Sequence, residues 1–128
     1  MKKNLLNDYV HERLRSVEQN LSAYQKDKEP ECLHLLRVDI KKLKAIFSFA
    51  GGVYKEKYAN DKLRPLFYNA GKIREIEINI NLLLQYPKPP ELLIDWLTKE
   101  KDSLIQQFIK NISRYIRLIS RFSGEISL

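Results

Sequence analysis

Apolar residues recur along this chain at alternating spacings of three and four, the spacing of residues on one face of an α-helix. The pattern divides into four segments, residues 3–27, 30–50, 61–86 and 90–123. Breaks near residues 27–30, 51–60 and 86–90 separate them, and we expect the middle one to keep some helix. Four long helices with short connections predict an all-α, four-helix up-down bundle that forms a single domain.

Residues 74–82 give an ambiguous signal. Ile76, Ile78 and Ile80 alternate with polar residues, as they would in a β-strand. Ile73, Ile76 and Ile80 also fit one face of a helix, and no other segment offers a partner strand. We therefore predict that this stretch is helical.

The second segment carries two stripes. The apolar one consists of Leu33, Leu36, Ile40, Leu43 and Phe47. A basic one follows the same rhythm one residue later and consists of His34, Arg37, Lys41 and Lys44. These four positions share an arc of roughly 80° beside the apolar stripe. A basic row in that place is expected to line the groove between this helix and a neighbour.

Charge is segregated along the chain, whose formal net charge is +7. Between Cys32 and Glu56 the only acidic residue is Asp39, and none lies between Asp102 and Glu125. The fourth segment places Lys110, Arg114, Arg117 and Arg121 in a narrow arc, nearly opposite its apolar stripe. Plain solvated surfaces mix the two signs, so this segregation favours an anionic partner.

Several function classes find no support in the sequence. Only two histidines, His11 and His34, are present, and no serine or cysteine lies in a recognisable nucleophile motif. Clustered metal ligands and a glycine-rich phosphate loop are also missing, so we expect no catalytic residue, no metal and no cofactor. The single cysteine and the lack of a signal peptide or membrane-spanning stretch predict a cytoplasmic protein.

Two motifs resemble those of the CHAD family, the conserved-histidine α-helical domains. His34-Leu35-Leu36-Arg37-Val38 followed by Lys41-Lys42-Leu43-Lys44 is similar to the family's signature helix. Gly71-Lys72-Ile73-Arg74-Glu75-Ile76-Glu77-Ile78 is similar to its second motif, with Lys and Glu where Arg and Asp are common. The resemblance implies binding of inorganic polyphosphate and places His34 on the family's named histidine.

The combined hypothesis is a polyphosphate groove between helices. Its expected residues are His34, Arg37, Lys41, Lys44, Lys72 and Arg74, with Arg114, Arg117 and Arg121 as the fourth-helix contribution. Glu75 and Glu77 are expected to hold basic side chains of neighbouring helices. Two alternatives stay open: a nucleic-acid-binding domain, in which Tyr54, Tyr58 and Tyr68 would stack on bases, and a basic scaffold that docks an acidic protein.

A homodimer is also expected. The family's usual domain has two related four-helix halves, and this chain shows one helix of the His-Arg-Val type, so residues 1–128 correspond to one half. The fourth segment carries apolar residues beyond its core stripe, namely Ile105, Ile109, Ile116 and Leu118. A broad apolar area of this kind is typical of an interface, which predicts a two-fold dimer that joins two basic grooves.

Overall fold

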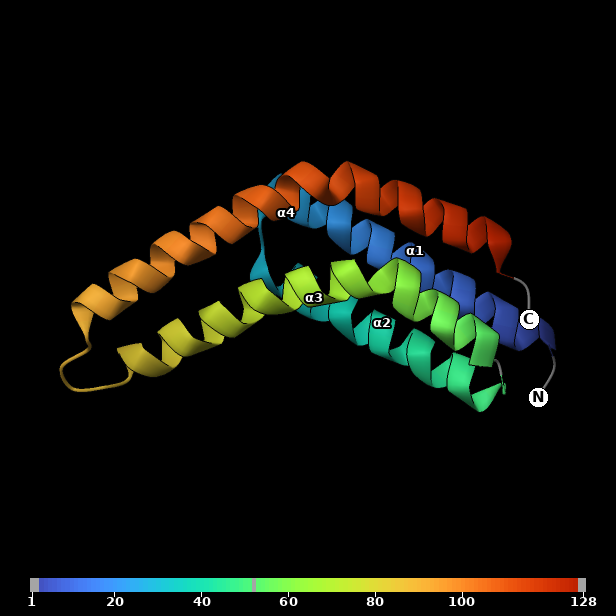
Figure 1. Ribbon diagram of the computed structural model, residues 1–128, viewed down its shortest axis with the longest axis horizontal. Coiled ribbons are helices and arrows are strands. Elements are labelled where there is room, and N and C mark those ends of the chain that lie inside the picture. The colour runs from blue at the N-terminus through green and yellow to red at the C-terminus, as the bar shows by residue number, and fades with distance from the viewer. Residues whose placement is uncertain (1–2, 52, 127–128) are drawn as a thin grey trace.

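The computed structural model describes residues 3–51 and 53–126. Over these residues it contains four helices, α1 (Lys3–Asp27), α2 (Pro30–Phe49), α3 (Val53–Leu84) and α4 (Glu91–Glu125), and no strand. Each helix packs against the next one in the chain, and α1 also packs against α4, so the four helices close into a ring (Figure 1). The predicted all-α bundle is confirmed.

The core is built from the predicted apolar stripes. Its largest fully buried side chains include Leu14, Leu21 and Tyr24 of α1, Leu36, Ile40 and Phe47 of α2, Leu63 and Leu66 of α3, and Tyr115 and Phe122 of α4. Aromatic pairs join helices edge to face, with ring centroids 5.7 Å apart for Tyr24 and Phe108 and 6.0 Å apart for Phe47 and Phe122. Burying each large aliphatic or aromatic side chain stabilises the fold by roughly 1.5–3 kcal/mol.

The ends of α2 follow from its sequence. Pro30 opens the helix, where its missing N–H has no intrahelical partner to lose. At the other end the Ala50 N–H donates to the Ile46 carbonyl, and Gly51 turns the chain with a φ of +68°. That left-handed conformation is free of steric cost only for glycine, so Gly51 ends the helix as predicted.

The break expected over residues 51–60 is shorter than predicted, because α3 already begins at Val53 and the helix expected to persist in this stretch is present. Ala59 and Leu63 are fully buried, so this stretch extends the core stripe of α3 instead of linking two helices. Pro65 lies inside α3, where it removes only the N–H that would donate to the Asp61 carbonyl. Residues 74–82 are helical, as predicted.

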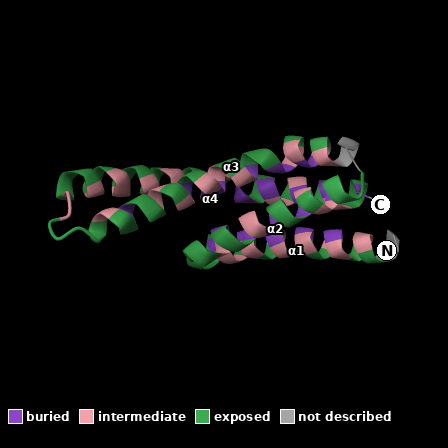
Figure 2. Cartoon of the chain, turned by 90° about the horizontal axis from the view of Figure 1, so that it is seen from below, coloured by how far each residue is buried: buried purple, intermediate pink, exposed green. Residues whose placement is uncertain are grey.

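The helices α3 and α4, with 32 and 35 residues, are longer than α1 and α2, with 25 and 20. Beyond the α1–α2 turn they continue alone as a two-helix projection, residues 82–100, which we call the hairpin (Figure 1). It exposes large apolar side chains, namely Leu82, Leu84, Tyr86, Leu92, Leu93 and Trp96. Figure 2 shows this end of the molecule as mostly exposed or half-buried.

The flanks of α4 differ from expectation. Ile105, Ile109, Ile116 and Leu118 are half-buried and pack against the core of the same chain. The reason is that α4 lies between α1 and α3, which cover both of its flanks. Over the described residues, no helix has an apolar stretch long enough to cross a membrane.

Candidate functional site

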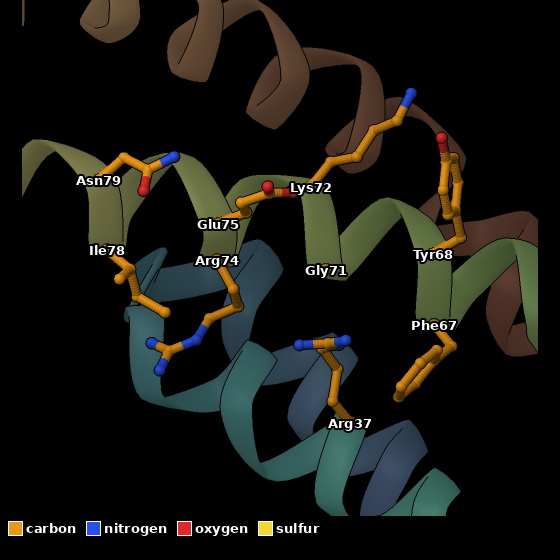
Figure 3. A pocket seen from close by; sticks show the side chains of 9 residues that line it. All are labelled: Arg37, Phe67, Tyr68, Gly71, Lys72, Arg74, Glu75, Ile78 and Asn79. Carbon is orange, nitrogen blue, oxygen red and sulfur yellow. The ribbon is translucent and has the colours of Figure 1, made fainter.

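A cleft of about 350 Å³ lies where α2 meets α3 (Figure 3). One of its residues, Arg37, comes from α2, and all the others come from α3. The full lining is Arg37, Phe67, Tyr68, Gly71, Lys72, Arg74, Glu75, Ile78 and Asn79. The two motifs found in the sequence therefore meet at this cleft.

Arg37 is held by packing instead of by an acid. Its guanidinium lies 4.3 Å from the centroid of the Phe67 ring. It also lies against bare backbone, since a Cβ on Gly71 would be 3.0 Å from one of its terminal nitrogens. Its Nε is buried without a hydrogen-bond partner, and no carboxylate of the described residues lies within ion-pair distance. The positive charge is fixed in place while lacking a counter-charge.

Lys44 adds a second cation to the same ring, with its Nζ 4.6 Å from the Phe67 centroid. Because both distances end at one centroid, the two charges are separated by no more than about 9 Å, close to one Debye length at physiological salt. Two like charges held so close repel each other until an anion lies between them. The arrangement therefore favours binding of an anion.

Lys72 and Arg74 extend the positive surface along α3. The Lys72 Nζ lies 4.7 Å from the centroid of the Tyr68 ring and points away from α2, whereas Arg74 points toward it (Figure 3). One terminal nitrogen of Arg74 lies 4.0 Å from Glu77 Oε1, so these two residues pair along the helix. Burial raises the pKa of Glu77, although Arg74 and Lys101 act in the opposite direction.

The acids do not hold basic side chains in the way we expected. Glu77 pairs with Arg74 of its own helix, and its interactions with neighbouring helices are electrostatic, with Lys101 of α4 and with the Tyr24 hydroxyl of α1. Glu75 lines the cleft and is exposed. A carboxylate at i and a basic residue three positions away share a helix face, which explains why the same-helix pair forms first.

The basic row of α2 divides into two. Arg37 and Lys44, seven residues apart, are half-buried and contact Phe67 of α3. His34 and Lys41, also seven residues apart, are exposed and are not among the residues that line the cleft. Seven residues make nearly two helical turns, so the two members of each pair point in nearly the same direction from the helix axis. The direction of His34 and Lys41 differs from that of Arg37 and Lys44.

The fourth-helix row lies apart from the cleft. Arg114, Arg117 and Arg121 are exposed on α4, which lies beside α3 and α1 and meets α2 across the core, where Phe122 contacts Phe47. Arg114 lies 6.0 Å from the ring centroid of its neighbour Tyr115. The structure thus gathers Arg37, Lys44, Lys72 and Arg74 and leaves the α4 arginines on a separate face.

Asp39 has a role that sequence reasoning missed. It is 4% exposed, lies 3.0 Å from an Arg13 guanidinium nitrogen and accepts a hydrogen bond from the Ser16 hydroxyl. These contacts fix α2 against α1 from the side opposite Phe67. The sequence did show Asp39 as the only acidic residue between Cys32 and Glu56. Phe67, the ring that both cations contact, left no comparable signal.

The remaining reactive side chains have structural environments. The two ring nitrogens of His11 lie 2.8 and 3.1 Å from the carbonyl oxygens of Asn7 and Ser123, which connects α1 to α4. Burial and nearby carboxylates, Glu29 foremost, raise the pKa of the Cys32 thiol, which keeps it protonated at neutral pH. Within the described residues, no three His, Cys, Asp or Glu side chains gather as metal ligands.

Fold and cleft together define a helical bundle that presents unneutralised cations in a preformed surface cleft. A family model of the CHAD domain matches residues 8–114, so the chain belongs to the CHAD domain family. Proteins of this family are associated with polyphosphate binding and are generally binding domains. No curated protein and no solved structure matches the chain.

Proposed function

We propose that this protein binds inorganic polyphosphate, without catalysing a reaction on it, through the cleft between α2 and α3. The observation that carries the proposal is Arg37, whose guanidinium is held between Phe67 and Gly71 with no acid of the described residues beside it. Lys44, Lys72 and Arg74 supply further charge around it. His34 and Lys41 are proposed to contact the chain at the edge of the cleft.

The chemistry of polyphosphate suits such a site. The ligand is a flexible chain of repeated negative charges with no base edges to read, so recognition rests on charge and on hydrogen bonds to phosphate oxygens. An arginine side chain can donate hydrogen bonds to two phosphate oxygens at once, whereas lysine acts as a movable point charge. Each phosphate that the protein neutralises releases counterions, which favours binding most strongly at low salt.

A binding titration with polyphosphate at several salt concentrations tests the proposal. Each lost phosphate contact should lower the slope of log affinity against log salt by about 0.7 for a single-strand-like polyanion. Arg37→Ala and Lys41→Ala should therefore weaken binding and flatten that slope. Lys42 is exposed on α2 like Lys41 but lies outside the basic row, so Lys42→Ala is the matched control for Lys41→Ala. An unchanged slope in Arg37→Ala would remove the cleft as the site.

Nucleic-acid binding is the competing function. Tyr68 is 58% exposed beside Lys72, and an exposed ring next to a cation is the combination that single-strand binders use. The side chains of Tyr54 and Tyr58 lie outside the described residues. Competition at equal phosphate concentration separates the two readings, because long-chain polyphosphate displaces the nucleic acid only if it is the preferred ligand.

The proposal includes a homodimer of one four-helix half, since the chain has a single helix of the His-Arg-Val type. The four α4 residues expected at the interface pack against their own core, so they do not supply the surface. We propose that the exposed apolar residues of the hairpin supply it instead.

A further inference from the structure

A second cleft, of about 290 Å³, adjoins the first. It lies where the start of α2 faces α3 and α4, and it is lined by Pro30, Arg74, Glu77, Ile78, Ile80, Asn81 and Lys101. Arg74 and Ile78 line both clefts, so the two hollows follow one another along α3 with Arg74 between them. Figure 3 shows the Arg74 side chain pointing from α3 toward the start of α2.

We propose that the bound polyanion runs along α3 from the first cleft, past Arg74, into the second cleft, where Lys101 of α4 binds it. This inference rests on the proposed function and makes it more specific. A ligand that fills both clefts has to be linear and long, whereas a short oligophosphate or a compact phosphate fills only the first. Lys101 thereby becomes a binding residue selective for long chains.

The charges of the second cleft support this path. Arg74 and Lys101 are the two cations, and Glu77 is the one acid that lines the cleft beside them. The Glu77 carboxylate lies 4.0 Å from Arg74, and its Oε1 is buried away from solvent. Glu77 therefore offsets one positive charge, and a net positive charge is left for the ligand.

The start of α2 carries opposing charges. Pro30 lines the cleft at the first turn of this 20-residue helix, which places the positive end of the helix dipole at its edge. Glu29 precedes the helix and Glu31 lies in its first turn, so two carboxylates offset the dipole there. The attraction for a polyanion in this cleft therefore rests on the side chains of Arg74 and Lys101.

The sequence around Lys101 gave no indication that this residue lines a cleft. Lys99, Glu100, Lys101 and Asp102 alternate in sign, which is typical of a solvated helix surface. Two residues along a helix correspond to a rotation of roughly 200°, so Lys99 and Lys101 point to nearly opposite sides. Lys101 is half-buried at the cleft, whereas Lys99 is exposed. The pair therefore provides a charge-matched test on a single helix.

The experiment compares Lys101→Gln with Lys99→Gln, using one short polyphosphate of a few residues and one long polyphosphate. We expect Lys101→Gln to weaken binding of the long chain at least threefold, to lower its log–log salt slope by about 0.7, and to leave the short chain unchanged. Lys99→Gln should bind both chains like the unaltered protein. Circular dichroism and thermal melting establish that both variants are folded.

Two results would overturn the inference alone: equal effects of the two substitutions on the long chain, or a Lys101→Gln effect of the same size on both chain lengths. In either case weakened binding by Arg37→Ala leaves the first cleft, and with it the proposed function, in place. If the unaltered protein binds neither chain, the proposed function and this inference fail together.

Discussion

Gly71 lets α3 approach the Arg37 guanidinium so closely that any side chain would intrude. A Cβ at this position would stand 3.0 Å from one terminal nitrogen and 3.1 Å from the central carbon of the guanidinium. The obstacle is the end of a flexible side chain, so the fold tolerates the change while Arg37 shifts. The glycine of the second motif is thus explained by the arginine of the first.

Gly71→Ala is therefore expected to separate stability from binding. Alanine favours a helix over glycine by about 1 kcal/mol, so the melting temperature should stay the same or rise. Displacement of Arg37 should weaken polyphosphate binding about three- to tenfold, as measured by titration at fixed salt.

Gly124→Ala is the control for this experiment, since Gly124 also lies in a helix and a Cβ there meets nothing within 4 Å. It should leave the affinity unchanged. If Gly71→Ala binds as tightly as Gly124→Ala, the position of the guanidinium does not determine the affinity.

At the scale of the helices, α2 is fixed on two sides. Phe67 of α3 contacts Arg37 and Lys44 on one side, and Arg13 and Ser16 of α1 bind Asp39 on the other. Asp39 is buried, so its two polar contacts compensate for the loss of hydration on folding. The rotation of α2, and with it the direction of Arg37, depends on both sets of contacts.

Asp39→Ala should destabilise the protein by about 1–3 kcal/mol, because the buried ends of Arg13 and Ser16 lose their acceptor. Chemical denaturation measures this change. Asp39→Asn keeps an acceptor for Ser16 and should lose less. A double-mutant cycle with Arg13→Met isolates the ion pair, and a coupling energy near zero would show that Asp39 stabilises the bundle by another route.

Periodicity predicted the helices and their buried faces because each stripe is a local property of the sequence. The motifs predicted Arg37, Lys72 and Arg74 at one site for the same reason. The division of the basic row into an inner and an outer pair, and the contact of Arg37 with Phe67, depend on the register of α2 against α3. Register is set by packing between residues about thirty apart in the sequence, which no local pattern encodes.

The separation of the α4 arginines from the cleft has a different origin. A helix in a ring of four lies beside two others, and here α4 lies beside α3 and α1, with α2 diagonally opposite across the core. The sequence shows that Arg114, Arg117 and Arg121 share a face but not which neighbours flank it. The same ring order covers the flanks of α4, which is why the apolar residues there are not the free surface that their number suggested.

The whole molecule is a four-helix body with a two-helix hairpin. In the body, the α1–α2 pair covers the α3–α4 pair, but at residues 82–100 the α3–α4 pair has no such cover (Figures 1 and 2). Leu92 is 87% exposed there and Trp96 58% exposed. Four further large apolar residues of the hairpin, Leu82, Leu84, Tyr86 and Leu93, are also exposed, and a gathering of this kind is typical of an interaction site.

A second copy, related by a two-fold axis, brings a second α3–α4 pair and restores four helices at the hairpin. We predict this homodimer, because large apolar side chains exposed together at one end of a molecule are typical of an interface. At micromolar concentration the mass in solution should be twice the 15.2 kDa of the chain, with and without polyphosphate.

The double substitution Leu92→Glu and Trp96→Glu should give a monomer that keeps its helicity. Phe49→Glu, at a 71% exposed position on the last turn of α2, should remain a dimer. A monomeric mass for the unaltered protein under both conditions would refute the dimer and leave a one-sided cleft as the binding surface.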